Sequence, residues 1–122
     1  NTLEAEWLST DEAIVQEYQA DPLVQRTTTP RWFIEVEAAQ KMLVRHAPEV
    51  TTPLLMLLGE DDKVADHTLA RTVFDLLGSA DKELQIYAGL RHEVFNERAR
   101  HRVFSDVVGW LKQRSTAAQR SM

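Results

Sequence analysis

The segment that decides the fold of this 122-residue chain reads PLLMLLGEDD, Pro53–Asp62. Residues 54–58 are all apolar, without alternation, and a proline and a glycine bound them. Five residues are too few for a buried helix, whereas a strand that is covered on both faces of a parallel sheet reads in this way. We therefore expect a strand at 54–58 that is followed directly by an acidic loop.

A second strand and two helices follow this segment. Residues 82–87 predict a strand, and a helix is expected between the strands, from about 66 or 67 to 77, with Gly78 as its C-cap. Asn96 is expected to cap a final helix with an apolar stripe through Val103 and Val107. The order strand–helix–strand–helix predicts an α/β fold in which two parallel strands are joined by a crossover helix.

Two helices are expected before the first strand. Ser9 and Glu12 fit a capping box for a short helix over about 11–19, which the proline at position 22 ends. Thr29 as N-cap and Pro30 at the first helical position predict a longer helix that ends near 45–46. The small and polar residues 115–122 predict a flexible tail.

Composition excludes several classes of function. The net charge of −5 argues against a nucleic-acid partner, which needs a basic face, and the absence of cysteine excludes disulfides and thiolate metal sites. No apolar run reaches the roughly 20 residues of a membrane span, and no signal peptide is visible at Asn1. We expect a cytoplasmic protein.

An acid and a histidine follow the two predicted strands. Asp62 lies four residues after Leu58, and His92 lies five residues after Tyr87. The carboxyl ends of parallel strands meet at one edge of a sheet, so the two side chains are expected to lie close together. A carboxylate there would set the tautomer of the imidazole and stabilise its charged form, as in a Ser-His-Asp relay.

Three longer segments carry a resemblance to a known family. They are Pro53–Asp62, Tyr87–Glu97 with the specific pattern His-Glu-x-x-Asn-Glu, and Asp106–Leu111, to which Tyr18–Leu23 adds a weaker match. Together they resemble the C-terminal part of α/β-hydrolases of the monoacylglycerol lipase and lysophospholipase type, which are serine aminopeptidase S33-like. The resemblance implies a helical cap or lid segment at 1–48, the C-terminal part of the hydrolase core at 49–114, and the tail at 115–122.

This resemblance also implies roles for particular residues. Asp62 would be the acid and His92 the base of the triad of a carboxylic ester hydrolase, with no cofactor and no metal. Trp32, Phe33 and Met42 would line a tunnel for the acyl chain or, alternatively, pack the cap onto the body. The cap would make transient contact with a membrane surface.

The nucleophile of such a relay is not in these 122 residues, because no Gly-x-Ser-x-Gly turn occurs in them. Two parallel strands also form only a marginal unit, so further strands are expected from outside this sequence. The expected partner is therefore the N-terminal part of the same enzyme, carrying the nucleophile and the oxyanion donors, and the chain is expected to be inactive without it. The expected substrate is a lipid or small ester.

Several alternatives remain open at this stage. With an aspartate as nucleophile, the same pair would serve an epoxide hydrolase or a dehalogenase, and the chain could also be a catalytically silent interaction module. Asp61 competes with Asp62 for the role of the acid, but it is expected to be a solvated loop residue, and Asp66 to be a helix N-cap.

Other charged residues are expected to have no role at the site. No histidine pair has the spacing of a helix-borne zinc site, and His46 and His101 are expected to face solvent. The basic cluster near the last helix is interpreted as a solvated face that two acidic residues balance. The basic residues are Arg98, Arg100, His101 and Arg102, and the acidic ones are Glu93 and Glu97.

Overall fold

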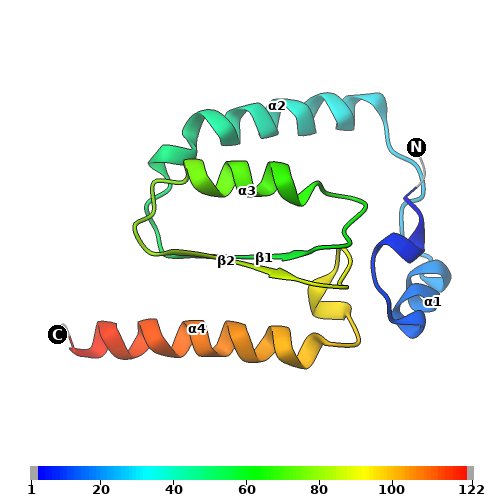
Figure 1. Ribbon diagram of the computed structural model, residues 1–122. Helices are drawn as coiled ribbons and strands as arrows, with labels where there is room; N and C mark the ends of the chain where they lie inside the picture. Colours follow the sequence, from blue (N-terminus) through cyan, green and yellow to red (C-terminus); the bar gives the residue numbers. More distant parts are fainter. Residues whose placement is uncertain (1–2, 121–122) are drawn as a thin grey trace.

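The computed structural model describes residues 3–120, which form four α-helices, two strands and three short 3-10 helices. In chain order these are η1 (Ala5–Trp7), α1 (Glu12–Ala20), α2 (Pro30–His46), η2 (Ala47–Glu49), β1 (Leu54–Gly59), α3 (His67–Leu76), β2 (Lys82–Tyr87), η3 (Val94–Asn96) and α4 (Arg100–Arg120). Figure 1 shows α2 and α3 on one side of the two strands and α4 on the other.

The two strands pair in parallel, as the sequence predicted. Leu54 is opposite Lys82, and the register continues without a break to Gly59 opposite Tyr87. Both strands therefore end at the same edge of the sheet, where α1 and the segment before it also lie (Figure 1). This edge holds the candidate site.

The buried core lies between the sheet and α4. It consists of Tyr87, Leu90, Val94 and Val103, with Leu57 of β1 packed against it. The Tyr87 hydroxyl donates a hydrogen bond of 2.9 Å to the Asp106 carboxylate, and burial together with this bond raises the pKa of Tyr87. The core thus fixes the end of β2 and the loop that follows it.

Many large apolar side chains outside this core are exposed. They lie on three helices and include Ile34 and Leu43 of α2, Leu69 and Leu76 of α3, and Phe104, Val108 and Leu111 of α4. Only Val103 of the stripe expected on the last helix is fully buried, since α4 lies against a sheet of only two strands within the described residues.

Three of the expected helix caps are wrong. The N-cap of α1 is Asp11, which accepts a bond from the Ala13 N–H, whereas Ser9 is buried and bonded elsewhere. Gly78 does not cap α3, which ends on an extended Leu77; a Cβ at Gly78 would instead collide with the carbonyl of Pro48. Asn96 is the last residue of η3, and α4 begins only at Arg100.

The predicted N-caps of α2 and α3, Thr29 and Asp66, are confirmed. Thr29 and Asp66 each accept a backbone N–H at the start of α2 and α3. The tail predicted at 115–122 differs from the structure, because α4 continues as far as Arg120; residues 121 and 122 lie outside the described part of the chain. The proposed division into a cap segment and a core stays a prediction.

Candidate active site

The loop after β1 holds Asp62 in a fixed orientation. Its Oδ1 atom accepts two backbone N–H groups, from Val64 at 2.7 Å and from Ala65 at 2.9 Å. The side chain is only 5% exposed. These two bonds occupy one carboxylate oxygen and leave Oδ2 free to accept from another donor.

Backbone hydrogen bonds join this loop to the loop after β2. The Glu60 N–H donates to the Tyr87 carbonyl and the Asp61 N–H donates to the Leu90 carbonyl, each at 2.9 Å. Gly59 makes this possible, because a Cβ at this position would collide with the carbonyls of Leu90 and Arg91. The residue type at 59 therefore permits the close approach that brings the two loops together.

Asp62 and His92 meet in this arrangement. Nδ1 of His92 lies 2.9 Å from Oδ2 of Asp62. Since the carboxylate can only accept, the hydrogen must be on Nδ1. Among the described residues Nε2 has no hydrogen-bond partner, and the side chain is 39% exposed. The imidazole is therefore arranged to accept a proton at Nε2.

Electrostatics keep Asp62 ionised in this position. Burial by itself would raise the pKa of Asp62, but the hydrogen bonds from His92 and from the Ala65 and Val64 N–H groups outweigh it, so the pKa of Asp62 lies below its ordinary value. An ionised carboxylate on Nδ1 stabilises the imidazolium that forms when Nε2 takes a proton.

The competing acids and histidines lie as the sequence predicted. Asp61 is exposed, and Asp66 caps α3. His46 pairs with Glu49 on the surface, and His101 is exposed on α4. Among the side chains that the structure describes, no group of three or more histidine or acidic residues is placed to hold a metal ion.

The three expected acyl-binding residues all lie on α2. Trp32, Phe33 and Met42 are exposed there, and the rings of Trp32 and Phe33 meet edge to face at 5.0 Å between centroids. The open cavity of about 630 Å³ beside Asp62 is lined by residues 60–67 and Arg91, and by no residue of α2. The structure thus brings Asp62 and His92 together but does not place these three beside them.

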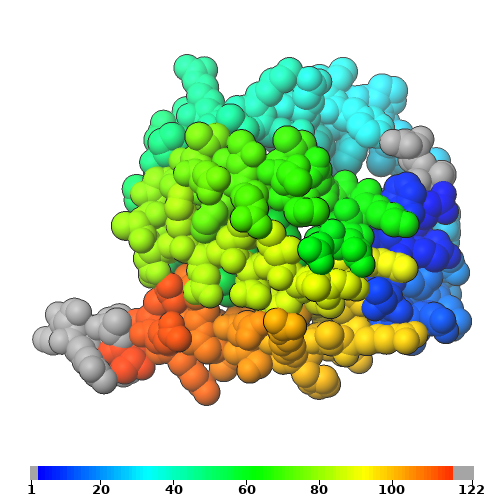
Figure 2. Space-filling view, in the orientation of Figure 1, coloured from blue at the N-terminus to red at the C-terminus, as the bar shows by residue number. Residues whose placement is uncertain are grey.

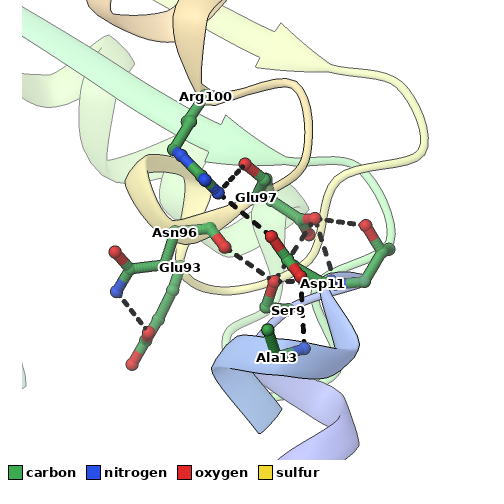
Figure 3. A network of polar contacts seen from close by, with 8 residues as sticks. Ser9, Asp11, Ala13, Glu93, Asn96, Glu97 and Arg100 are labelled. Atoms are coloured by element: carbon green, nitrogen blue, oxygen red, sulfur yellow. Dashed lines mark hydrogen bonds and ion pairs between the residues drawn. The ribbon is translucent and has the colours of Figure 1, made fainter. Parts of the chain in front are cut away.

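The sequence interpretation of Glu97 as part of a solvated face is wrong. Glu97 is fully buried and accepts hydrogen bonds from the N-terminal segment and from the His92 loop. Figure 3 shows it beside Ser9 and Asp11 of the N-terminal segment. Figure 2 shows the N-terminal segment, in blue, beside this yellow loop at the end of the sheet. The sequence feature that could have indicated a special role for Glu97 is its place in the family pattern His-Glu-x-x-Asn-Glu. No hydrophobic periodicity distinguishes this residue.

Among the described residues, no helix has the length and apolar character needed to cross a membrane.

Comparison with protein families gives a match over most of the chain. Residues 1–99 match the family described as "Serine aminopeptidase, S33". The chain is 35% identical to a monoacylglycerol lipase of Mycolicibacterium smegmatis over 111 residues, which are 89% of this chain and 39% of that protein. It is 32% identical to the human monoglyceride lipase over 114 residues, 91% of this chain and 38% of the relative.

Solved structures agree with the sequence comparison. The crystal structure of Paleococcus ferrophilus monoacylglycerol lipase matches with a TM-score of 0.83 at 25% identity, over 89% of this chain and 43% of that one. A monoglyceride lipase of Saccharomyces cerevisiae at 24% identity and a TM-score of 0.79 shows the same fold. The chain covers 39% of the first of these relatives and 43% of the Paleococcus structure, and so spans about two fifths of their length. Its fold is that of the C-terminal part of an α/β-hydrolase.

Proposed function

Because this chain belongs to the serine aminopeptidase S33 family of α/β-hydrolases, we propose that it supplies the acid and the base of a Ser-His-Asp relay that cleaves carboxylic esters. One observation carries the proposal. Nδ1 of His92 is held by the Asp62 carboxylate at 2.9 Å, while Nε2 is free among the described residues. This is the orientation in which a histidine can take a proton from a serine hydroxyl.

The reaction needs two rounds of proton transfer at Nε2, and in each of them His92 takes up one proton and then gives it away. In the first, His92 removes the proton of a serine hydroxyl as the oxygen attacks the ester carbonyl, and the Asp62 carboxylate stabilises the resulting imidazolium. The imidazolium then gives this proton to the leaving alcohol. In the second half of the reaction, His92 takes a proton from a water molecule as the water attacks the acyl-enzyme, and then returns this proton to the serine oxygen as the acid is released.

The nucleophile and the oxyanion donors are proposed to come from a preceding part of the same protein. Two features support this partner: the chain spans only 39% of a similar lipase, and apolar side chains are exposed on α3 and α4. A further strand would pair with the free edge of β1, whose only partner among residues 3–120 is β2.

A monoacylglycerol or a lysophospholipid is the proposed substrate. The support is that similar proteins are named monoacylglycerol lipase, in Mycolicibacterium smegmatis, and phospholipase, in Bacillus subtilis. The exposed aromatic and sulfur side chains of α2 fit contact with an acyl chain or with a lipid surface, and we propose that α2 belongs to a cap over the site.

A serine-directed fluorophosphonate probe tests the proposal on the protein expressed from its complete coding region. We expect labelling of the wild type and of His101→Ala, whose histidine is exposed on α4, and its loss in His92→Ala. Hydrolysis of a monoacylglycerol and of a lysophospholipid, measured side by side, then identifies the preferred substrate.

Two results would contradict the proposal. A folded wild type that does not react with the probe would indicate a different nucleophile, such as the aspartate of an epoxide hydrolase, or a protein without activity. Labelling of His92→Ala at the wild-type rate would remove His92 from the reaction.

A further inference from the structure

A buried carboxylate lies behind the loop that carries His92. Glu97 is 0% exposed, although it lies in the short connection between η3 and α4 and not within a strand or helix. A buried carboxylate is costly unless several donors surround it. The structure provides these donors from two segments that are far apart in the sequence, and Figure 3 shows the side that faces the N-terminal segment.

One carboxylate oxygen of Glu97 holds the His92 loop. Oε1 accepts the backbone N–H of Arg91 at 2.7 Å, and Arg91 directly precedes His92. It is the shorter of the two bonds that Glu97 accepts from backbone N–H groups, since the bond from Thr10 measures 3.0 Å.

The other oxygen holds the N-terminal segment. Oε2 accepts the backbone N–H of Thr10 at 3.0 Å and also the Thr10 hydroxyl. The Ser9 hydroxyl lies 3.5 Å from the same oxygen, but it makes its shorter bond, of 2.8 Å, to the Asn96 carbonyl. Glu97 therefore bridges Thr10 and Arg91 with its two oxygens.

Further hydrogen bonds join residues 91–93 directly to the N-terminal segment 7–9. The Glu93 N–H donates to the Leu8 carbonyl at 2.8 Å, and the His92 N–H donates to the Trp7 carbonyl at 3.4 Å. The Arg91 guanidinium donates to the Ser9 carbonyl at 3.0 Å. The backbone on both sides of the imidazole is thus tied to segment 7–10.

From this arrangement we infer that Glu97 is a positioning residue for His92, an inference that rests on the proposed function. The direction of the imidazole depends on the backbone dihedral angles at 91 and 92, which the Glu97 bridge restrains. With the bridge in place, Nδ1 meets Asp62 and Nε2 points to the reacting atoms. Without it, the Arg91 N–H loses its acceptor, although the loop keeps the backbone bonds to Asp61, Trp7 and Leu8.

Glu97→Gln tests this role in the protein expressed from its complete coding region. The amide keeps the shape of the side chain, but it replaces one of the two accepting oxygens by an N–H₂ group. This group faces the N–H of either Arg91 or Thr10, so one of the two hydrogen bonds is lost. We expect kcat for ester hydrolysis to fall between about tenfold and about a hundredfold, because a small misplacement of a catalytic group has an effect of this size. KM should stay within about twofold, since substrate contacts do not change.

Glu93→Gln is the matched control. It makes the same change four positions earlier, next to His92, and among the described residues the Glu93 carboxylate bonds only to the exposed Asn96 amide. We expect this variant to keep the kcat of the wild type. Equal kcat values for Glu97→Gln and Glu93→Gln, in a wild type that is active and depends on His92, would overturn the inference while leaving the proposed function intact.

A spectroscopic measurement separates positioning from activity. The proton on Nδ1 of His92, identified by its loss in His92→Ala, should give a low-field NMR resonance in the wild type and in Glu93→Gln. It should be lost or broadened in Glu97→Gln if the bridge orients the ring. An unchanged resonance would contradict the inference, and this result can be read even if the wild type hydrolyses no ester.

Thr10 provides a second pair of variants if Glu97→Gln does not fold. Thr10→Val removes the hydroxyl that donates to Glu97 and keeps the branched shape, whereas Thr10→Ser keeps the hydroxyl. We expect Thr10→Val to lower kcat and weaken the resonance, and Thr10→Ser to restore both. The same values in the two variants would overturn the inference.

Discussion

At the scale of single residues, the orientation of one carboxylate decides what the site can do. Asp62 presents Oδ1 to the N–H groups of Val64 and Ala65 and Oδ2 to His92. Each oxygen therefore has a defined set of donors, and the carboxylate cannot rotate without losing hydrogen bonds. This fixed orientation selects the Nδ1–H tautomer of His92.

Asp62→Asn tests the selection of the tautomer. The asparagine can keep the loop bonds of Oδ1 but turns an N–H₂ group toward Nδ1, so the ring is expected to carry its hydrogen on Nε2 instead. In the complete protein we expect kcat to fall by roughly 10⁴-fold, as in other relays with this change. The measurement is ester hydrolysis, with Asp61→Asn as control because Asp61 is exposed. Comparable losses in both variants would show that Asp62 has no special role.

The sequence distinguished Asp62 from its neighbours but misjudged Glu97. Spacing after the strand was enough to choose Asp62 over Asp61, because the length of a short loop decides which side chain reaches the next loop. Glu97 was interpreted as part of a solvated face, where it would balance the basic cluster at 98–102. Its donor Thr10 lies 87 positions earlier, and no local pattern carries that information.

At the scale of elements, side-chain caps position the helices around the site. Asp66 accepts the Thr68 N–H at 2.8 Å and the Thr68 hydroxyl at 2.6 Å, and it thereby starts α3 directly after the Asp62 loop. The hydrogen bond from the Thr68 side chain is the main reason why the pKa of Asp66 lies below its ordinary value.

The cap makes the contribution of Asp66 to stability depend on pH. Since folding lowers the pKa of Asp66, the stabilisation is complete above its ordinary value of about 3.9 and is lost as the pH falls through the lowered value. We expect Asp66→Ala to lower the Tm of the complete protein at neutral pH. Thermal unfolding followed by circular dichroism should show this difference shrink in strong acid.

Asp75→Ala, on the same helix, is the control for this prediction. Asp75 lies in the last turn of α3, where a negative charge is unfavourable for the helix dipole. This variant should not lower the Tm at neutral pH. A loss of Tm in Asp66→Ala that is the same in acid and at neutral pH would show that the carboxylate does not act as the cap.

Both strands and the start of α2 could be predicted because their signals are local. An apolar run between a proline and a glycine marked the first strand, Leu84 and Ile86 marked the second, and Thr29-Pro30 marked the helix. The start of α1 could not be decided locally, since Ser9 and Asp11 are both good N-caps. Ser9 is bonded to the Asn96 carbonyl, which leaves Asp11 to cap the helix and to pair with Arg100 at 3.0 Å.

At the scale of the whole molecule, the described part of the chain leaves many large apolar side chains exposed. Its described sheet has two strands, and large apolar side chains of α2, α3 and α4 are exposed. An unpaired strand edge beside exposed apolar surface favours association with other chains. The stability of these 122 residues is therefore expected to depend on contacts with further strands.

Residues 1–122 expressed alone should therefore aggregate or remain partly unfolded. Size-exclusion chromatography and thermal unfolding followed by circular dichroism test this expectation. Co-expression with the preceding part of the protein should give a soluble complex that unfolds cooperatively. A soluble monomer of residues 1–122 with a sharp cooperative transition would contradict the prediction.

The sequence by itself determined the two strands, their parallel pairing and the placement of Asp62 and His92 at one edge of the sheet. These features follow from local hydrophobic patterns, from turn residues and from the topology of parallel strands, all of which can be read along the chain. Only the tertiary structure decided which polar groups are buried and what satisfies them, as the bridge from Arg91 through Glu97 to Thr10 shows. The physical reason is that a buried carboxylate accepts hydrogen bonds from whichever segments pack around it in the folded chain. These segments can be far apart in the sequence, and no local sequence pattern indicates that they meet.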